Sequence, residues 1–227
     1  MTKKEKREIM ALAVERLEAL YPDALCALEW NGEPWRLLVM GRLSAQCTDA
    51  RVNIVCRELF AKYPTCSDLA DASLSDIEDI IRPCGLFRSK AESIKSSCTL
   101  LRDSYGGALP DSMEELLKFP GVGRKIANLL LGDVYGKPAI VADTHCMRIC
   151  GRLGMYREGR KDPLYTERVM SELVSGEKQS DFCHRIVQFG RDVCTARSPA
   201  CDSCPLSDIC AHAEKIGVKR KKTIDLT

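Results

Sequence analysis

Apolar residues recur at intervals of three and four along most of the chain, the spacing that places side chains on one face of an α-helix. The first such run comprises Ile9, Leu12, Ala13, Leu17 and Leu20, and Pro22-Asp23 ends it. The same pattern predicts further helices over residues 35–46, 52–63, 75–82, 87–105, 112–119, 124–135, 144–153, 163–174 and 181–193. The apolar residues 139–142 have no partner strand and are expected to form a buried connection. The predicted fold class is therefore all-α.

Two serine-containing sequences predict where short helices begin. Ser75 is followed three positions later by Glu78, and Ser112 by Glu115. In such a capping box the serine and glutamate side chains each satisfy a backbone amide at the start of the helix. Both serines are therefore expected to be helix N-caps, the second for a helix that runs only to Phe119.

Composition narrows the class of protein without identifying a partner. The 227 residues are 45% hydrophobic and 29% charged, as is typical of a soluble globular chain. The net charge is only +2, so an interaction with nucleic acid has to be argued from local features. No apolar run approaches the roughly 18 residues that a membrane helix needs, and the charged N-terminal sequence does not resemble a signal peptide. We expect a cytoplasmic protein with no membrane partner.

The segment from Lys215 to Lys222 carries five basic residues and no acidic one. A solvated terminus is the expected interpretation, with an arm that contacts phosphates as the alternative.

Thirteen cysteines are an odd number, which excludes complete internal pairing. Nine of them are scattered, mostly beside apolar residues: Cys26, Cys47, Cys56, Cys66, Cys84, Cys98, Cys146, Cys150 and Cys183. We expect these to be small core residues with free thiols in a reducing compartment.

Residues 116–125 have the pattern of a short helix, a tight glycine turn and a second helix. Gly121 and Gly123 permit positive φ and lack a Cβ, so their backbone can approach another surface closely. The turn leaves amide N–H groups free at the start of the second helix, where the helix dipole favours an anion such as a phosphate. Such a site holds a nucleic-acid backbone without reading its sequence. The alternative is a turn that only connects two helices.

Lys125 lies in the first turn of that second helix, where the positive end of the dipole disfavours an ammonium ion. The neighbouring Arg124 adds a like charge, and partial burial would act in the same direction. A neutral amine is a nucleophile that can form a Schiff base with a sugar carbon. The alternative is a lysine that only contacts phosphate.

Asp143 directly precedes the helix predicted over 144–153, so one expected role is to cap that helix. Its carboxylate can also face a cleft, where it can take a proton from a lysine or stabilise positive charge on a sugar. His145 is expected to make a supporting hydrogen bond and not to perform chemistry.

The remaining cysteines, Cys194, Cys201, Cys204 and Cys210, have the spacing C-x6-C-x2-C-x5-C. Four thiolates in so short a loop can surround a metal. Zinc sites of four cysteines usually combine two close C-x2-C pairs, whereas this loop has one. The wider steps favour a [4Fe–4S] cluster, in which each of four irons needs one thiolate. Zinc, or no metal, are the alternatives.

These features, in this order, resemble the endonuclease III family of DNA glycosylases, a branch of the helix-hairpin-helix superfamily. The matching segments are 43–49, 85–91, 120–125, 141–145 and the cysteine loop 194–210, so the resemblance covers most of the chain.

The resemblance implies an enzyme that removes oxidised or damaged pyrimidines from double-stranded DNA and then cuts the strand 3′ to the abasic site by β-elimination. Lys125 would attack C1′ of a flipped-out nucleotide, and Asp143 would assist. The nucleotide must leave the stack because C1′ cannot be reached inside it. The expected partner is duplex DNA with a damaged base or an abasic site, bound by a monomer.

The resemblance also assigns residues that contact DNA or metal. Gln46 and Leu86 would fill the space that the extruded base leaves. The other expected DNA contacts are Gly121, Val122, Gly123, Arg124 and His145. Cys194, Cys201, Cys204 and Cys210 would hold a [4Fe–4S] cluster with a structural and DNA-docking role.

The family fold has two helical lobes with the active cleft between them. The resemblance places a six-helix barrel lobe with the hairpin at residues 27–137, and the cluster lobe at residues 1–26 plus 138–227. Arg42 departs from the family, whose members usually carry an apolar residue there. It is expected either to reach the base pocket and alter the preferred lesion, or to keep its charge at the surface.

Three other classes fit parts of the sequence. An adenine-mismatch glycosylase would usually lack Lys125 and carry an additional C-terminal domain. A non-catalytic DNA-binding or iron–sulfur scaffold would bind an abasic duplex and leave it intact. A zinc-binding interaction module would give a colourless preparation, unlike a brown iron–sulfur protein.

Overall fold

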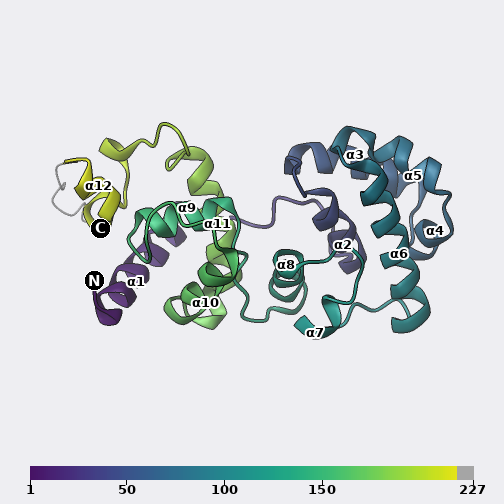
Figure 1. The fold of residues 1–227 in the computed structure, drawn as a ribbon, viewed down its shortest axis with the longest axis horizontal. Helices are drawn as coiled ribbons and strands as arrows, with labels where there is room; N and C mark the ends of the chain where they lie inside the picture. The colour runs from purple at the N-terminus through teal and green to yellow at the C-terminus, as the bar shows by residue number, and fades with distance from the viewer. Residues whose placement is uncertain (219–227) are drawn as a thin grey trace. The chain divides into compact units, whose positions relative to one another are not determined.

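The computed structural model describes residues 1–218, and the chain divides into two compact units (Figure 1). One unit comprises Cys26–Lys137 and is called the hairpin unit. The other comprises Met1–Leu25 with Pro138–Thr227 and is called the cysteine-loop unit. All regular elements over residues 1–218 are helices, with no strand among them, which confirms the predicted all-α class.

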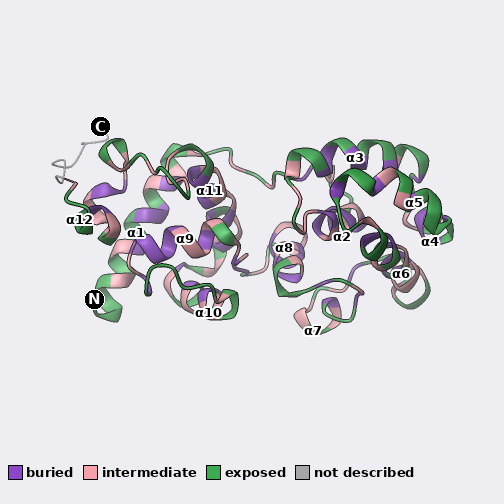
Figure 2. Ribbon diagram, turned by 45° about the horizontal axis from the view of Figure 1, so that its top comes forward, coloured by how far each residue is buried: buried purple, intermediate pink, exposed green. Residues whose placement is uncertain are grey.

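The hairpin unit is built around α2, Pro34–Leu43, which packs against α3, α6 and α8. Seven of its ten residues are buried, and Figure 2 shows this buried stretch in purple. Pro34 begins the helix, where its missing N–H is not needed. The other elements are α3 Asp49–Lys62, α4 Cys66–Asp71, α5 Leu74–Ile81, the 3-10 turn η1 Arg82–Cys84, α6 Phe87–Tyr105, α7 Met113–Leu116 and α8 Arg124–Tyr135.

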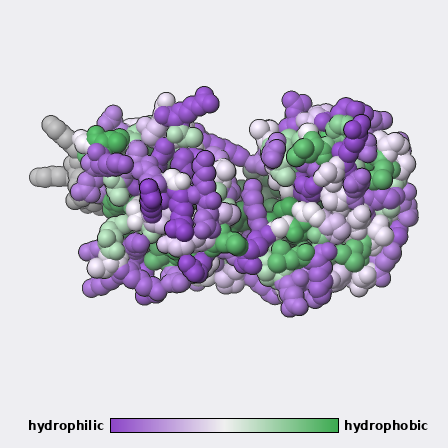
Figure 3. All heavy atoms as spheres, in the orientation of Figure 1, coloured by the Kyte–Doolittle hydropathy of each residue, from purple (hydrophilic) through white to green (hydrophobic). Residues whose placement is uncertain are grey.

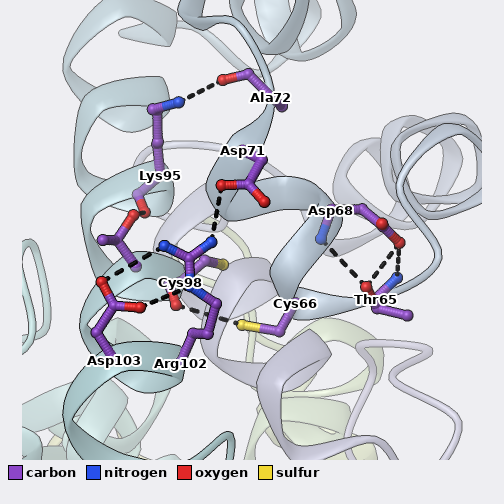
Figure 4. A network of polar contacts seen from close by, with 10 residues as sticks. Thr65, Cys66, Asp68, Asp71, Ala72, Lys95, Cys98, Arg102 and Asp103 are labelled. Atoms are coloured by element: carbon purple, nitrogen blue, oxygen red, sulfur yellow. Dashed lines mark hydrogen bonds and ion pairs between the residues drawn. The ribbon is translucent and has the colours of Figure 1, made fainter.

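Polar contacts join the second half of α6 to α4 and to the residue after it (Figure 4). The Arg102 guanidinium donates to Asp71 at 2.8 Å and to Asp103 at 2.6 Å. Lys95 donates from its ammonium group to the carbonyl of Ala72. These charges lie at the rim of the unit, where ion pairs contribute little stability, and they leave the apolar side of α6 to the core.

The cysteine-loop unit combines the N-terminal helix with the last third of the chain. α1, Lys3–Leu20, packs against α10 and α11. The other elements are α9 Thr144–Arg152, α10 Pro163–Leu173, η2 Gly176–Lys178, α11 Gln179–Asp192, η3 Cys201–Ser203, η4 Ser207–Ile209 and α12 Ala211–Lys215. Arg16 of α1 donates to both carboxylate oxygens of Asp208, at 2.9 Å on the longer contact. This ion pair ties α1 to the loop that carries the four clustered cysteines.

Two local predictions were wrong. The N-cap of α5 is Ser73, two residues before Ser75, and its hydroxyl accepts from Asp76 N–H at 3.1 Å, so the helix begins at Leu74. On α1, Leu12 and Leu20 are exposed, whereas Met10 and Val14 are buried. Both errors have one physical cause. More than one serine could cap α5 and more than one set of apolar residues could face the core from α1, and tertiary packing selected among these alternatives.

Other local predictions were confirmed in part: the helices predicted over 35–46 and 112–119 are present but end earlier, at Leu43 and Leu116. The Ser112 hydroxyl caps α7 by accepting from Glu115 N–H at 3.3 Å. Its expected capping-box partner does not reciprocate, because the Glu115 carboxylate instead accepts from Tyr105 and Lys118. Ala139 and Ile140 are buried in an irregular connection, as expected.

None of the thirteen cysteines, all of which lie within residues 1–218, forms a disulfide. Six of the nine scattered ones are buried, while Cys26, Cys47 and Cys66 are half-buried. The prediction that the scattered cysteines are core residues is therefore confirmed for six of them and was wrong for these three.

Hydrophilic side chains cover most of the face of each unit that Figure 3 shows. Over residues 1–218, no helix combines the length and the apolar character needed to cross a membrane. The basic residues from 219 onward, which include most of the predicted tail, lie outside the described residues.

Candidate functional site

The turn between α7 and α8 is held in place by the hairpin unit itself. Phe119 and Val122 are buried, at 2% and 7% exposure, and Val122 N–H donates to Phe119 O at 3.0 Å. The Ser97 hydroxyl on α6 donates to Pro120 O at 3.0 Å. Gly121, at φ +77°, takes the left-handed conformation that glycine adopts without strain. The hairpin geometry therefore follows from packing and needs no ligand.

Arg42 covers this turn. Its Nε donates to Ser93 Oγ at 2.7 Å and its Nη2 to Ser89 Oγ at 3.1 Å, so it joins α2 to α6. A Cβ on Gly121 would lie 2.4 Å from Arg42 Nε. Arg42 is half-buried and packs directly over the glycine turn, a role that neither sequence interpretation included.

No side chain caps the first amide groups of α8, because the residue before the helix is a glycine. Gly123 is the N-cap, in extended conformation, and makes no side-chain cap hydrogen bond. A helix of 12 residues begins here with Arg124 and Lys125, both exposed. The arrangement suits an anion at the helix N-terminus. Lys125 is exposed, so burial adds nothing to the effect of the helix dipole on its amine.

Gln46 and Leu86 share an unusual backbone conformation. Gln46 has φ +55° and Leu86 has φ +49°, in the left-handed region that costs a non-glycine residue about 1–3 kcal/mol. Both are exposed, Leu86 at 57%. Gln46 lies in the turn after α2, and Leu86 is the N-cap of α6. An exposed leucine on strained backbone is the kind of feature that structures retain for a contact with another molecule.

Asp143 caps α9, as predicted. Its Oδ1 accepts from Cys146 N–H at 2.7 Å. The cap engages one carboxylate oxygen, and the backbone of Asp143 is extended, which turns the side chain back over the first turn of the helix.

His145 belongs to a hydrogen-bond network that leads to the cysteine loop. Its Nδ1 lies 3.2 Å from Arg148 Nη2, which also donates to Cys194 O at 2.9 Å. A Cβ on Gly190 would lie 2.3 Å from His145 Nδ1, so only glycine permits this approach. The expected supporting hydrogen bond of His145 is therefore present.

The four clustered cysteines line one cavity in the cysteine-loop unit. Apolar side chains form much of the remaining wall, among them Ile149, Leu153, Phe189 and Leu206. Two nitrogens donate to the sulfurs: Arg152 Nη1 to Cys194 Sγ at 3.2 Å, and Leu206 N–H to Cys204 Sγ at 3.4 Å. Hydrogen bonds of this kind stabilise thiolates that bind metal.

The separation of the sulfurs distinguishes between the candidate metals. Around a tetrahedral zinc ion, with Zn–S bonds of about 2.3 Å, sulfurs lie about 3.8 Å apart. No three of these four Sγ atoms, all within the described residues, lie within 4.8 Å of one another. In a [4Fe–4S] cluster each thiolate binds a different iron, which holds the sulfurs further apart. The donor set therefore fits the cluster better than zinc.

Three buried cations within residues 1–218 were not predicted from the sequence: Lys90, Arg152 and Arg185. Arg152 is 8% exposed and donates to Cys194 Sγ and to Thr195 O. Lys90 is 0% exposed and donates to two backbone carbonyls. For Lys90 a signal exists, because it shares the helical register of the apolar positions Ile94 and Leu101. For Arg152 no sequence pattern indicates its contact with a cysteine 42 positions away.

The fold and the hairpin define a class of protein. A model of the HhH-GPD superfamily base excision DNA repair proteins matches residues 39–175, and a model of the iron–sulfur binding domain of endonuclease III matches residues 194–210.

Curated relatives and solved structures narrow this class. Endonuclease III of Synechocystis sp. is 40% identical over 94% of this chain and 96% of its own length. The Escherichia coli K12 endonuclease III is 33% identical over 96% and 100%. A trapped endonuclease III–DNA covalent intermediate matches with a TM-score of 0.86 at 40% identity, over 92% of this chain and 98% of the other. A non-covalent endonuclease III–DNA complex matches with a TM-score of 0.87 at 40% identity, over 94% and 99%.

The chain therefore belongs to the endonuclease III family of base excision DNA repair enzymes. It is a DNA glycosylase and abasic-site lyase with an iron–sulfur binding domain.

Proposed function

We propose that this chain removes oxidised or fragmented pyrimidines from duplex DNA through a covalent imine on Lys125. The observation that carries the proposal is the position of Lys125. It is exposed in the first turn of α8, directly after the uncapped glycine turn, so one element presents both a phosphate site and an amine. Binding the backbone there places the amine close to the sugar of a bound nucleotide.

The reaction follows from the chemistry of an amine and a sugar carbon. Lys125 Nζ attacks C1′, the N-glycosidic bond breaks, and the base leaves with a proton. Loss of the amine protons and opening of the sugar ring give an imine between Nζ and C1′. A proton then leaves C2′, the 3′ phosphate departs by β-elimination, and water releases the lysine. Each step conserves atoms and needs no oxidant or reductant.

Asp143 is proposed to accept a proton from the Lys125 amine and to stabilise the positive charge that develops on the sugar. Support comes from its cap geometry, which fixes the carboxylate at the start of α9 through one oxygen. The proposal thus assigns Lys125 of the hairpin unit and Asp143 of the cysteine-loop unit to the same reaction.

The remaining DNA contacts are proposed from position. Gln46 and Leu86, exposed on left-handed backbone, would fill the space that the extruded base leaves. Gly121, Gly123 and Arg124 would hold a phosphate, with the buried Val122 contributing only its backbone. His145 would support these contacts through its network to Cys194.

The four cysteines Cys194, Cys201, Cys204 and Cys210 are proposed to hold the [4Fe–4S] cluster. When bound, the cluster cross-links a loop that has only short 3-10 turns of its own. We further propose that the hairpin unit corresponds to the six-helix barrel lobe of the family, at residues 27–137, and the cysteine-loop unit to its cluster lobe. The enzyme is proposed to act as a monomer in a reducing compartment, where the nine scattered cysteines form no disulfides.

Borohydride trapping tests the proposal. Wild type, Lys125→Ala and Lys118→Ala are incubated with a duplex that contains one thymine glycol, and covalent adducts are counted. Lys118 is the matched control, because it is an exposed lysine nearby whose ion pair with Glu115 lies on α7 and its C-terminal end. We expect adducts with wild type and Lys118→Ala only. Adduct formation by Lys125→Ala, or tight binding by wild type without any adduct, would contradict the proposal.

A further inference from the structure

Lys90 is an ammonium group enclosed by the hairpin unit. It lies in the first turn of α6 and is 0% exposed. Its Nζ donates to Leu43 O at 2.8 Å and to Cys84 O at 2.9 Å. Burial lowers the pKa of Lys90, although the nearby thiols of Cys47 and Cys84 act in the opposite direction.

The two acceptors have the same structural role. Leu43 is the last residue of α2, and Cys84 is the last residue of η1. Carbonyl groups at the end of a helix lack an intrahelical partner and carry the negative end of the helix dipole. A single lysine therefore caps the C-terminal ends of two segments that are 41 positions apart in the sequence.

Each capped carbonyl stands just before Gln46 or Leu86, both of which lie on left-handed backbone. Gln46 follows Leu43 by three positions, and Leu86 follows Cys84 by two. The backbone N–H of Lys90 also donates to Leu86 O at 3.0 Å. The side chain and the backbone of Lys90 thus hold both turns from one point.

The energetics indicate that buried Lys90 contributes more to fixing the positions of the two turns than to the free energy of unfolding. Burying an ammonium ion costs several kcal/mol, and a well-packed apolar side chain at the same place would avoid that cost. An apolar residue cannot hold two carbonyl oxygens at a fixed separation, whereas charge-assisted hydrogen bonds do so with defined geometry.

We propose that Lys90 is a positioning residue that fixes the distance between Gln46 and Leu86, so that both enter the duplex together when a nucleotide leaves the stack. The inference rests on the proposed function of Gln46 and Leu86. It assigns to Lys90 no contact with DNA and no part in the chemistry at C1′.

The test compares two substrates that differ in how hard the nucleotide is to extrude. A thymine glycol nucleotide must be unstacked and unpaired, whereas an abasic nucleotide has no base to unstack. Single-turnover rates are measured on both duplexes for wild type, Lys90→Met and Lys95→Met. Lys95 is the matched control: it is a half-buried lysine on the same helix that donates to one carbonyl, that of Ala72, and to neither turn (Figure 4).

We expect the single-turnover rate of Lys90→Met on thymine glycol to be about 30-fold to 100-fold lower than that of wild type. This is the size of effect that small displacements of positioned groups have on rates. Its rate on the abasic duplex should stay within about threefold of wild type. Lys95→Met should change neither rate. In a Leu86→Ala variant, adding Lys90→Met should lower the rate on thymine glycol only slightly further, because both substitutions disable the same step.

The outcomes separate this inference from the proposed function. If wild type excises no pyrimidine lesion, the proposed function fails. If wild type is active and Lys90→Met loses equally on both substrates, or matches Lys95→Met on both, the positioning role is refuted.

A second variant, Lys90→Gln, keeps the inference testable if Lys90→Met does not fold. Lys90→Gln keeps two N–H donors without the charge, and circular dichroism establishes which variants fold. Gln is expected to retain more activity on thymine glycol than Met, with the abasic rate unchanged. Equal loss on both substrates by Lys90→Gln would also refute the role. Hydrogen exchange of the amides in residues 44–47 and 84–87 should be faster in both Lys90 variants and unchanged in Lys95→Met.

Discussion

The glycine hairpin at residues 116–125 and the cysteine loop at residues 194–210 reach defined geometry by different means. Buried residues fix the hairpin from within: Phe119 and Val122 anchor it, and Arg42 packs over Gly121. The cysteine loop buries Leu206 but is otherwise short turns around a cavity lined by four thiols. The hairpin is therefore complete as a folded chain, whereas we expect the loop to need the metal that its thiols bind in order to keep its geometry.

The largest expected effect comes from removing one metal ligand. Burial raises the pKa of the Cys204 thiol to about 12, so a metal that binds it has to displace the thiol proton. In Cys204→Ser, protection of amides in the cysteine loop against hydrogen exchange should fall by about 1,000-fold, while that of the hairpin amides stays within about threefold. Iron content is measured on the same samples.

Cys66→Ser is the control, because Cys66 is half-buried in the hairpin unit and lines no metal cavity. It should leave both segments unchanged. If the hairpin amides of Cys204→Ser also lost protection against hydrogen exchange, the proposed difference between the two segments would be contradicted.

The next effect separates capping from catalysis at Asp143. Asparagine caps helices as well as aspartate does, but it cannot accept a proton. Asp143→Asn should therefore leave the midpoint of thermal unfolding within about 2 °C. It should slow excision by about 100-fold or more. A fall in stability with unchanged excision would show that Asp143 only caps α9.

A smaller effect is expected for Gly121. Gly121→Ala adds a strained positive φ and displaces Arg42, so it should destabilise the protein by about 2–3 kcal/mol and weaken binding to an abasic duplex. Gly107 is the matched control: it has φ +84°, and a Cβ there meets nothing within 4 Å. Gly107→Ala should cost about 1 kcal/mol and leave binding intact. Denaturant unfolding and a binding titration measure both quantities, and equal losses in the two variants would mean that the Arg42 contact is unimportant.

The smallest expected effect concerns the N-cap of α5. Ser73→Ala should cost about 1 kcal/mol, because Ser73 caps the helix, whereas Ser75→Ala should cost less than about 0.5 kcal/mol. Urea unfolding of the two variants is sufficient. A larger loss of stability in Ser75→Ala than in Ser73→Ala would instead support Ser75 as the N-cap, as predicted from the sequence.

These predictions show what the sequence revealed and what it did not. Helix positions followed from periodicity and breakers, and α6 and α8 have the bounds that were predicted for them. The choice between Ser73 and Ser75 could not be made locally, because both are followed by an acidic residue at the third position. The hairpin and the cysteine spacing were visible as motifs, since their chemistry lies in residues close together in the chain.

Contacts between distant segments were not visible in the same way. Arg42 over Gly121 joins positions 79 apart, and no local pattern indicates that pair. The left-handed backbone of Gln46 and Leu86 has no side-chain signature, because neither is a glycine, asparagine or aspartate. Lys90 was detectable in principle as a charge in an apolar helical register, but its acceptors are backbone atoms that every sequence possesses.

The cysteine-loop unit is discontinuous in the chain, and this affects how the protein is made. α1 leaves the ribosome before the rest of its unit, yet its buried residues Met10 and Leu17 belong to a core that includes Ile186 and Phe189. The whole of Cys26–Lys137 is synthesised in between and can fold as a unit while α1 waits with its apolar side uncovered. During translation the apolar side of α1 is thus exposed until α9, α10 and α11 have been synthesised.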